Sequence, residues 1–190
     1  FLFLASLPYS ENTITSWPTS PVLLDRKGGV FAVFLSEDSE WSIPVPLGAM
    51  GKWLPLVAVE VEDRRFREHS GIDWIALLRA TVQNARAGRV VSGASTITSQ
   101  LVRLSSPTPR PRTWPVKVEE FLGALTLERA LSKEAILESY LNKAPFGGNL
   151  RGVEAASRAY FGKRARYLAP SEAALLVGLL QSPTLFRPDR

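Results

Sequence analysis

The sequence contains no cysteine and only one histidine, His69. The absence of cysteine excludes disulfide bonds, thiolate catalysis and the usual zinc clusters of small domains. A single histidine also argues against a transition-metal site built by the protein alone. Any chemistry of this chain therefore rests on carboxylates, hydroxyls, amides and cationic side chains.

Long hydrophobic runs are missing as well. A membrane-spanning helix needs roughly 20 apolar residues, and the apolar start of the chain, Phe1-Leu2-Phe3-Leu4-Ala5, is far shorter. This stub fits either the cut end of a transmembrane anchor or a buried N-terminal strand. With 190 residues, of which 45% are apolar and 22% charged, the chain can bury one sizeable core. We therefore expect a single domain with two lobes at most.

Basic residues outnumber acidic ones. The chain has 23 lysines and arginines against 18 acidic residues, a formal net charge of +5 and a pI of about 9.8. This surplus favours an anionic partner, and nucleic acid, anionic lipid headgroups and a pyrophosphate substrate all satisfy it. The choice among them must come from motifs.

The residue pattern changes near residue 50. Before this point, Val22–Leu24 and Val30–Phe34 flank a turn at residues 25–29, which predicts a β-hairpin. From Lys52 onward the apolar spacing is helical. We predict a mainly α fold with a small N-terminal β-hairpin arm, divided into a membrane-proximal segment, residues 1–50, and a main domain, residues 51–190.

Seven helices are predicted from apolar residues at three- and four-residue spacing. Their ranges are Leu54–Arg67, Trp74–Ala87, Ser95–Leu104, Lys117–Leu131, Ser132–Leu141, Leu150–Phe161 and Ser171–Leu180. Residues 105–115 contain four prolines interleaved with arginines and Trp114. Since proline fixes φ and removes a hydrogen-bond donor, this stretch is predicted to be an extended, cationic surface loop.

Carboxylates and arginines follow the first predicted helix in Glu62-Asp63-Arg64-Arg65-Phe66-Arg67-Glu68-His69-Ser70-Gly71-Ile72-Asp73. A solvated helix end is the ordinary explanation of such a stretch. If Glu62 instead faces a cleft, it can act as a general base, kept ionised by Arg64 or Arg65.

A second stretch reads Ser92-Gly93-Ala94-Ser95-Thr96-Ile97-Thr98-Ser99-Gln100-Leu101-Val102-Arg103. On a helix, Thr96, Gln100 and Arg103 share one face. A helix beginning at Ser95 would offer free amides and a positive dipole end to an anion. An amphipathic helix with a serine cap is the alternative.

Two further segments stand out. In Lys117-Val118-Glu119-Glu120, acidic residues in a first helical turn usually serve the helix dipole, although a carboxylate there can also hold a divalent ion on a diphosphate. The segment from Ile136 to Lys163 contains three glycines between two helices, which predicts a tight turn and a role in shaping the fold.

Taken together and in this order, these segments resemble glycosyltransferase family 51, the lysozyme-like transglycosylase domain of class A penicillin-binding proteins and of monofunctional cell-wall glycosyltransferases. The resemblance covers about Trp53 to Pro188 and rests on EDRRFREHSGID, SGASTITSQLVR, KVEE, ILESYLN, APFGGNLRGVEAASRAYFGK and SEAALLVGLLQSP. The variants APFGGNL and LFRPDR are closest to the penicillin-binding protein 1C type. The resemblance implies a lysozyme-like, two-lobed helical fold.

The resemblance also implies a set of site residues. Glu62 is the implied general base and Glu120 the second important carboxylate, a candidate ligand of Mg²⁺ or Mn²⁺; no organic cofactor is implied. Substrate-binding positions are Asp63, Phe66, His69, Ser95, Thr96, Gln100, Arg103 and Lys117, with a structural, hydrogen-bonded role expected for His69.

The chain departs from the family pattern at Ala94, Ser99 and Val116, where Gly, Gln and Arg are usual. Arg103 replaces the usual lysine, keeps its charge and adds a planar fork suited to phosphate.

The implied activity is inverting polymerisation of lipid II into β-1,4-linked glycan strands with release of undecaprenyl diphosphate. It implies the outer face of the bacterial cytoplasmic membrane, an N-terminal transmembrane anchor mostly absent from this chain, and contact with the growing glycan and the membrane surface. A C-terminal transpeptidase domain and cell-wall synthesis proteins are implied partners, and nucleic acid is not. Two alternatives stay open: a lysozyme-like peptidoglycan hydrolase and a non-catalytic module that binds lipid II.

Overall fold

The computed structural model describes residues 14–89, 91, 93–106, 111 and 113–181. The apolar stub at residues 1–5, Ser92 and most of the proline-rich stretch, residues 107–110 and 112, lie outside the described residues. In the part of the chain that is described, every helix is too short or too polar to cross a bilayer.

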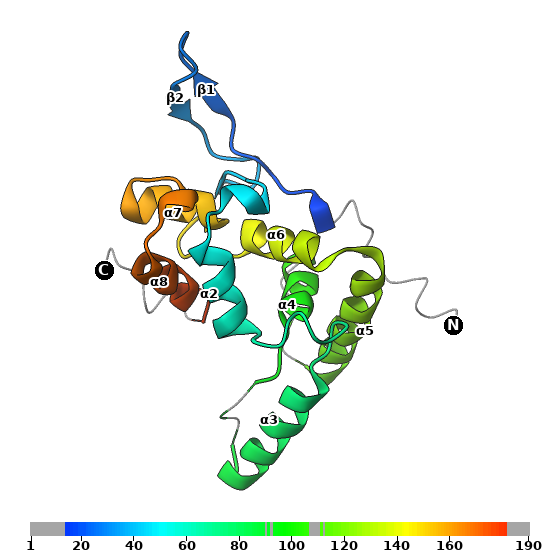
Figure 1. Ribbon diagram of the computed structural model, residues 1–190. Helices are drawn as coiled ribbons and strands as arrows, with labels where there is room; N and C mark the ends of the chain where they lie inside the picture. Colours follow the sequence, from blue (N-terminus) through cyan, green and yellow to red (C-terminus); the bar gives the residue numbers. More distant parts are fainter. Residues whose placement is uncertain (1–13, 90, 92, 107–110, 112, 182–190) are drawn as a thin grey trace.

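Helices dominate the described chain, which confirms the prediction of a mainly α fold. They are α2 (Trp53–Glu62), α3 (Trp74–Ala87), α4 (Ile97–Leu104), α5 (Trp114–Ala130), α6 (Lys133–Lys143), α7 (Val153–Phe161) and α8 (Pro170–Gln181) (Figure 1). Two short 3-10 helices, η2 (Leu47–Ala49) and η3 (Ala165–Tyr167), precede α2 and α8.

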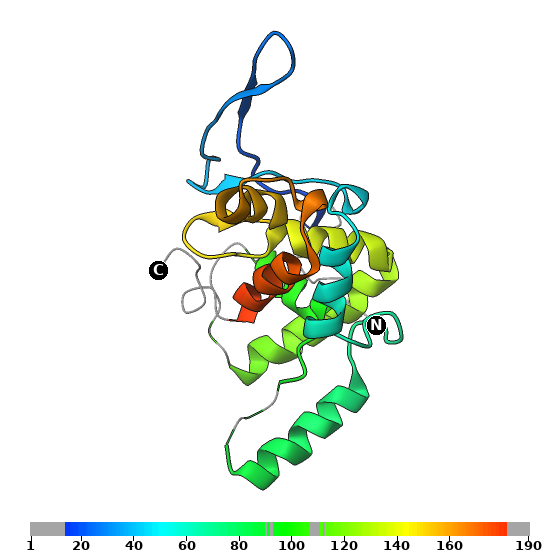
Figure 2. The same ribbon diagram turned by 60° about the vertical axis from the view of Figure 1, so that its left-hand side comes forward.

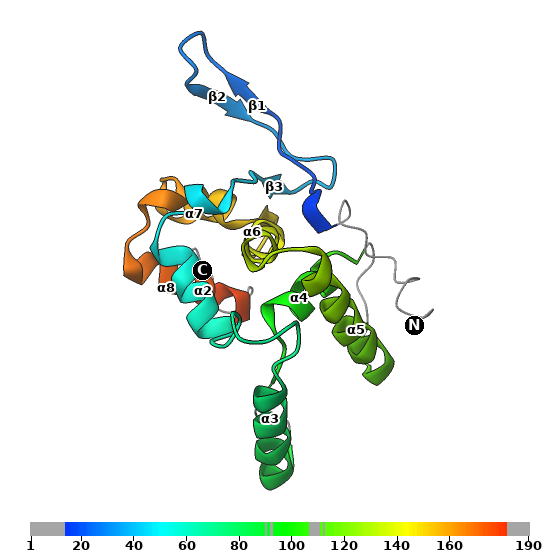
Figure 3. The same cartoon turned by 45° about the vertical axis from the view of Figure 1, so that its right-hand side comes forward.

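The predicted hairpin is also confirmed. Strands β1 (Val22–Leu24) and β2 (Val30–Val33) pair antiparallel, and the hairpin projects away from the helices in all three views (Figures 1, 2 and 3). A second pairing was not expected: β3 (Trp41–Ser42) runs parallel to β4 (Leu150–Arg151). The helix predicted from Leu150 therefore begins only at Val153. The strand was missed because two residues are too few to show an alternating pattern. The boundary at residue 50 stays a prediction.

Helix α4 lies at the centre of the core. It packs against α5 and α6, while α2 packs against α8 (Figure 1). Ile97, Leu101 and Val102 of α4 have no exposed surface. This burial holds one face of α4 rigidly in the core, so that side chains on its other face have fixed positions.

Polar side chains of α6 hold the segment that leads into α2. Glu138 Oε2 accepts a hydrogen bond from Leu47 N at 2.7 Å, and the Asn142 carboxamide both accepts from Val45 N and donates to Val45 O. Gly152 has φ +80°, and a Cβ there would lie 2.7 Å from Asn142 O. These contacts fit the prediction that this part of the sequence shapes the fold.

Helix α3 extends from the body at the end opposite to the hairpin (Figures 2 and 3). Asp73 caps its start by accepting from Ile75 N and Ala76 N, and Gly88 ends it in the left-handed conformation. Only Ala80 of this helix is buried. Helix α3 thus forms a wall that projects from the core.

Candidate active site

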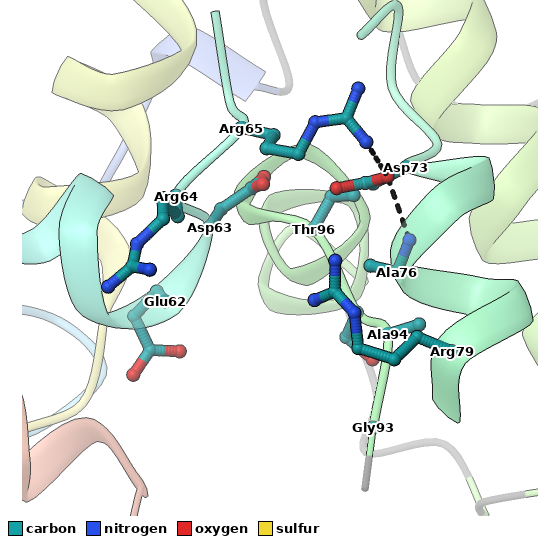
Figure 4. Close-up of a pocket in the computed structure, with 11 residues that line it drawn as sticks. Glu62, Asp63, Arg64, Arg65, Asp73, Ala76, Arg79, Gly93, Ala94 and Thr96 are labelled. Carbon is teal, nitrogen blue, oxygen red and sulfur yellow. Dashed lines mark hydrogen bonds and ion pairs between the residues drawn. The ribbon is translucent and has the colours of Figure 1, made fainter. Parts of the chain in front are cut away.

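A pocket of about 240 Å³ lies between α2, α3 and the segment before α4. Its walls are residues 62–65, Asp73, Ala76 and Arg79 at the start of α3, and residues 93–96 (Figure 4). Two of the stretches singled out in the sequence therefore meet at one pocket.

Helix α2 ends at Glu62, five residues earlier than predicted. The chain leaves the helix at Asp63, whose Oδ2 accepts from Ile97 N at 2.9 Å. A carboxylate from outside thus caps the start of α4. Because the helix ends here, Glu62 lies at the edge of the pocket.

The two oxygens of Glu62 differ in their surroundings. Oε2 accepts a hydrogen bond from Gln100 Nε2 at 3.0 Å. Oε1 is buried and has no hydrogen-bond partner among the described residues. A buried acceptor without a donor is costly in a native fold, and such atoms gather at functional sites. Glu62 therefore has one oxygen fixed by Gln100 and one whose hydrogen-bonding capacity is unused in the described part of the chain.

Gln100 connects Glu62 to a residue that the sequence had not singled out as functional. Its Oε1 accepts from Tyr140 OH at 3.1 Å. Burial, together with the negative charges of Glu62 and Asp63, raises the pKa of Tyr140 above its usual range, so this hydroxyl stays protonated. The available signal was a tyrosine on the apolar side of the ILESYLN helix, because a buried tyrosine hydroxyl requires a polar partner.

His69 has the structural contacts expected for it. Its Nδ1 accepts from Gly71 N at 3.2 Å, and its Nε2 lies 3.0 Å from Asp63 Oδ1. Since Nδ1 accepts, the ring proton is on Nε2 and is donated to Asp63. Asp63 is thereby held between His69 and the start of α4.

Phe66 and Thr96 are placed in the interior. Phe66 has no exposed surface, so the structure places it in the core and not at the pocket surface. Thr96 touches the pocket, but its hydroxyl donates to Gly71 O at 2.7 Å and accepts from Ser99 N at 3.1 Å. Both positions fix the loop between α2 and α3 against α4.

The predicted helix start at Ser95 is wrong, and with it the expected set of free amides at that residue. The helix begins at Ile97 and not at Ser95. The amide of Ile97 donates to Asp63, and the amide of Ser99 donates to Thr96. The amides of Ile97 and Ser99 are therefore satisfied within the protein and are not free to hold a diphosphate.

Arg103, Lys117 and Glu120 form a compact ion cluster. Arg103 donates to both oxygens of Glu120, at 2.6 and 3.1 Å, and Lys117 Nζ donates to Oε2 at 2.9 Å. Burial alone raises the pKa of Glu120, but hydrogen bonds from the two cations outweigh it and hold that pKa below its usual value. Lys117 also donates to Ser95 Oγ at 2.9 Å, and Ser95 lines the pocket. The cluster has one net positive charge and lies beside the pocket.

Glu120 does not fit the expected metal-ligand role. Both of its oxygens already face cations, which repel a divalent ion. Across the described ranges, no group of three histidine or acidic side chains is placed to hold a metal.

The alternative dipole role of Glu120 is also wrong. Helix α5 begins at Trp114, three residues before the predicted start, with Pro115 in its first turn. Proline is tolerated there because a first-turn amide needs no helical acceptor. Glu120 therefore lies in the second turn and is buried.

Arg79 was missed by the sequence reading. It lies on α3, and Figure 4 shows its side chain reaching toward the middle of the pocket. Among the residues that the structure describes, Arg79 forms no ion pair, whereas Arg64 pairs with Glu60 and Arg65 with Glu68 and Asp73. It is therefore the cation of this pocket wall most available to an anionic ligand.

Comparison with known proteins adds independent findings. A family model described as Transglycosylase matches residues 27–190. Penicillin-binding protein 1C of Escherichia coli (strain K12) is 43% identical over 169 residues, which cover 89% of this chain and 22% of that protein. Biosynthetic peptidoglycan transglycosylase of Pasteurella multocida (strain Pm70) is 38% identical over 174 residues, which cover 91% of this chain and 70% of that protein. The chain thus spans less than a quarter of the first relative.

Proposed function

Because this chain belongs to the transglycosylase family, the glycosyltransferase family 51 that its motifs resemble, we propose that it polymerises lipid II into β-1,4-linked glycan strands. Undecaprenyl diphosphate is the leaving group of this reaction. The observation that carries the proposal is the Glu62 carboxylate at the pocket edge. One of its oxygens is held by Gln100, and the other is buried without a donor among the described residues.

Glu62 is the proposed general base. Its carboxylate takes the proton from the 4-hydroxyl of the acceptor GlcNAc while the hydroxyl oxygen attacks C1 of the donor MurNAc. The C1–O bond to the diphosphate breaks on the opposite face, which inverts the configuration at C1 and gives a β bond. Base assistance of this kind is usually worth 10²- to 10⁴-fold in rate.

Negative charge grows on the diphosphate as it leaves, and cations near the pocket stabilise it. The Arg103–Lys117–Glu120 cluster supplies one net positive charge, and Ser95 connects Lys117 to the pocket. A hydrolase that attacks with water has no diphosphate to receive. The cluster therefore favours transfer over the lysozyme-like hydrolase that the sequence left open.

Arg79→Ala is expected to raise KM for lipid II about tenfold, because one charge-assisted contact to an anionic substrate is lost. The side chain is exposed and unpaired within the described residues, so the melting temperature should stay unchanged. Steady-state kinetics of polymerisation measure this effect. Arg86→Ala, on the same helix but absent from the pocket walls, is the matched control. Equal KM values for wild type and Arg79→Ala would remove Arg79 from the substrate site.

The direct test of the function is to incubate the protein with labelled lipid II in detergent, with and without moenomycin. Long glycan strands that moenomycin suppresses support the proposal. Shortened sacculi without polymer would identify a hydrolase, and lipid II binding without turnover would identify a non-catalytic module. Either of the last two outcomes overturns the proposed function.

We also propose that α3 lies against the outer surface of the cytoplasmic membrane, where a lipid-linked substrate resides. Its side chains Trp74, Ile75, Leu78 and Val82 are 65%, 55%, 67% and 41% exposed. Apolar side chains this exposed on one helix are unusual for a surface facing water alone. The relatives' names support a cell-wall location, and we include a transpeptidase domain and cell-wall synthesis proteins among the proposed partners.

Replacing Trp74 and Leu78 by serine is expected to weaken binding to anionic lipid vesicles by about tenfold or more, since each buried apolar side chain contributes about 1.5–3 kcal/mol. Vesicle co-sedimentation measures the binding. Val22→Ser with Leu24→Ser provides a matched control, because these hairpin residues are exposed at the opposite end of the molecule. Stronger loss in the hairpin variant would assign the membrane surface to that end instead.

A further inference from the structure

Tyr140 lies behind Glu62 and outside the walls of the pocket. It comes from α6 in the core, where 1% of its surface is exposed. Its hydroxyl donates to Gln100 Oε1 at 3.1 Å, and Gln100 Nε2 donates to Glu62 Oε2 at 3.0 Å. Three residues from three helices, α6, α4 and α2, thus form one hydrogen-bonded line that ends at the proposed base.

The orientation of the Gln100 carboxamide decides what Glu62 meets. The two ends of a carboxamide are similar in shape but opposite in hydrogen-bonding sense, since the oxygen accepts and the nitrogen donates. With the amide turned over, the Gln100 oxygen would face Glu62 Oε2, and two acceptors would repel each other. The carboxylate of Glu62 can only accept, and it therefore selects the orientation with the NH₂ group toward it. The Tyr140 hydroxyl donates to Gln100 Oε1 and so stabilises this orientation with a second hydrogen bond.

We propose that Tyr140 is a positioning residue, which helps to hold the Gln100 amide with its NH₂ group toward Glu62 Oε2 and so fixes the Glu62 carboxylate at the pocket edge. This inference rests on the proposed function of Glu62 as a base. Tyr140 touches neither the pocket nor a reacting atom, and its effect passes through Gln100 alone.

The rest of the surroundings of Glu62 do not depend on Tyr140. Charged groups at the pocket are Asp63, Arg64 and Arg65 beside Glu62, with Asp73 and Arg79 across from it. Each of these keeps its own contacts when the Tyr140 hydroxyl is removed. A change in the behaviour of Glu62 in Tyr140→Phe therefore reports on the Gln100 amide.

Tyr140→Phe keeps the ring and its packing and removes only the hydroxyl. The expected result is a fall in kcat of about fivefold near neutral pH, the equivalent of one hydrogen bond, with KM unchanged. The acidic limb of the pH profile of kcat should move to higher pH, because a carboxylate that loses a donor is protonated more easily. Purely structural damage would lower kcat at every pH and leave the position of the limb unchanged, which would overturn the proposal.

A double-mutant cycle separates action through Gln100 from a direct effect. If Tyr140 acts only through Gln100, Tyr140→Phe should cost nothing further in a Gln100→Ala background. Independent, additive losses would overturn the proposal. Tyr160→Phe is the matched control, since Tyr160 also donates to a neighbour, Phe146 O at 2.8 Å, and is absent from the pocket walls. Its pH profile should equal that of the wild type.

A spectroscopic measurement keeps this proposal distinct from the proposed function. In protein labelled with ¹⁵N at glutamine, the Gln100 side-chain NH₂ signal should shift as Glu62 titrates, and this response should be weakened in Tyr140→Phe. If the response is unchanged in the variant, the positioning role is wrong whatever the activity. If the response is weakened but Glu62→Gln still polymerises lipid II, the positioning stands and the function fails.

Discussion

Glu62→Gln is expected to reduce polymerisation of lipid II by 10²- to 10⁴-fold, on the order of 3 to 5 kcal/mol in the activation barrier. A carboxamide has nearly the shape of the carboxylate but cannot accept the proton of the acceptor hydroxyl. The oxygen of the new carboxamide can still accept from Gln100 Nε2, so the fold should be retained. Initial rates of glycan-strand formation, with the melting temperature measured alongside, provide the test.

Glu60→Gln is the matched control for this variant. Glu60 is on the same helix and makes an exposed ion pair with Arg64, with 56% and 75% of the two side chains accessible to solvent. Such pairs contribute roughly 0–1 kcal/mol, so activity and stability should both stay close to wild type. A Glu62→Gln protein that forms strands at the wild-type rate would remove Glu62 as the base, and with it the proposed mechanism.

Glu120→Gln is expected to lower the free energy of unfolding by about 3 kcal/mol and the rate of polymerisation by about 10- to 100-fold. The substitution leaves Arg103 and Lys117 beside each other without the carboxylate that joins them. Both cations keep some contact with solvent, so we expect the lower end of the range for a broken buried pair. Chemical denaturation and steady-state rates measure the two effects.

The stability effect of Glu120→Gln should depend on pH. The pKa of Glu120 is lowered in the folded protein from its ordinary value of 4.5, so its contribution is fully present above that value. It is lost as the pH falls through the folded-state pKa. The difference between wild type and variant should therefore be constant near neutrality and shrink below about pH 4.5.

Two comparisons test the role given to Glu120. Glu134→Gln, which removes an exposed pair with Arg67, should change stability little. A metal titration of the Glu120→Gln enzyme should match that of the wild type, since Arg103 and Lys117 already occupy both carboxylate oxygens. A metal dependence lost in Glu120→Gln alone would restore the ligand role and contradict the placement described above.

Periodicity predicted most of this fold because apolar residues recur at helical spacing along its helices, most of which bury an apolar face. The predicted and observed ranges of α3 agree at both ends. Asp73 marks its start and Gly88 its end, and both signals are local in the sequence. Where the end of an element depends on a distant residue, prediction failed. Helix α2 stops at Glu62 because Asp63 bonds to Ile97, which is 34 residues away along the chain.

Prediction of the candidate site had the same limit: local sequence identified residues, but not their contacts with distant residues. The motifs identified Glu62 and Gln100, but not that one holds the other. Local reading assigned Thr96 to the ligand, whereas the fold uses its hydroxyl for Gly71 O. Neither Arg79 nor Tyr140 was marked by its residue type as functional. Only the packing of their helices places one in the pocket wall and the other behind the base.

Helix α3 contributes Ala76 and Arg79 to the pocket, yet only Ala80 to the buried interior. Displacing it would expose almost no core, whereas Glu62 and Asp63 on the facing wall are tied to α4, which is fully packed. The free-energy cost of widening the pocket therefore depends on the displacement of α3 alone. For the proposed polymerisation, this arrangement would let α3 move aside for a glycan chain while Glu62 keeps its position on the other wall.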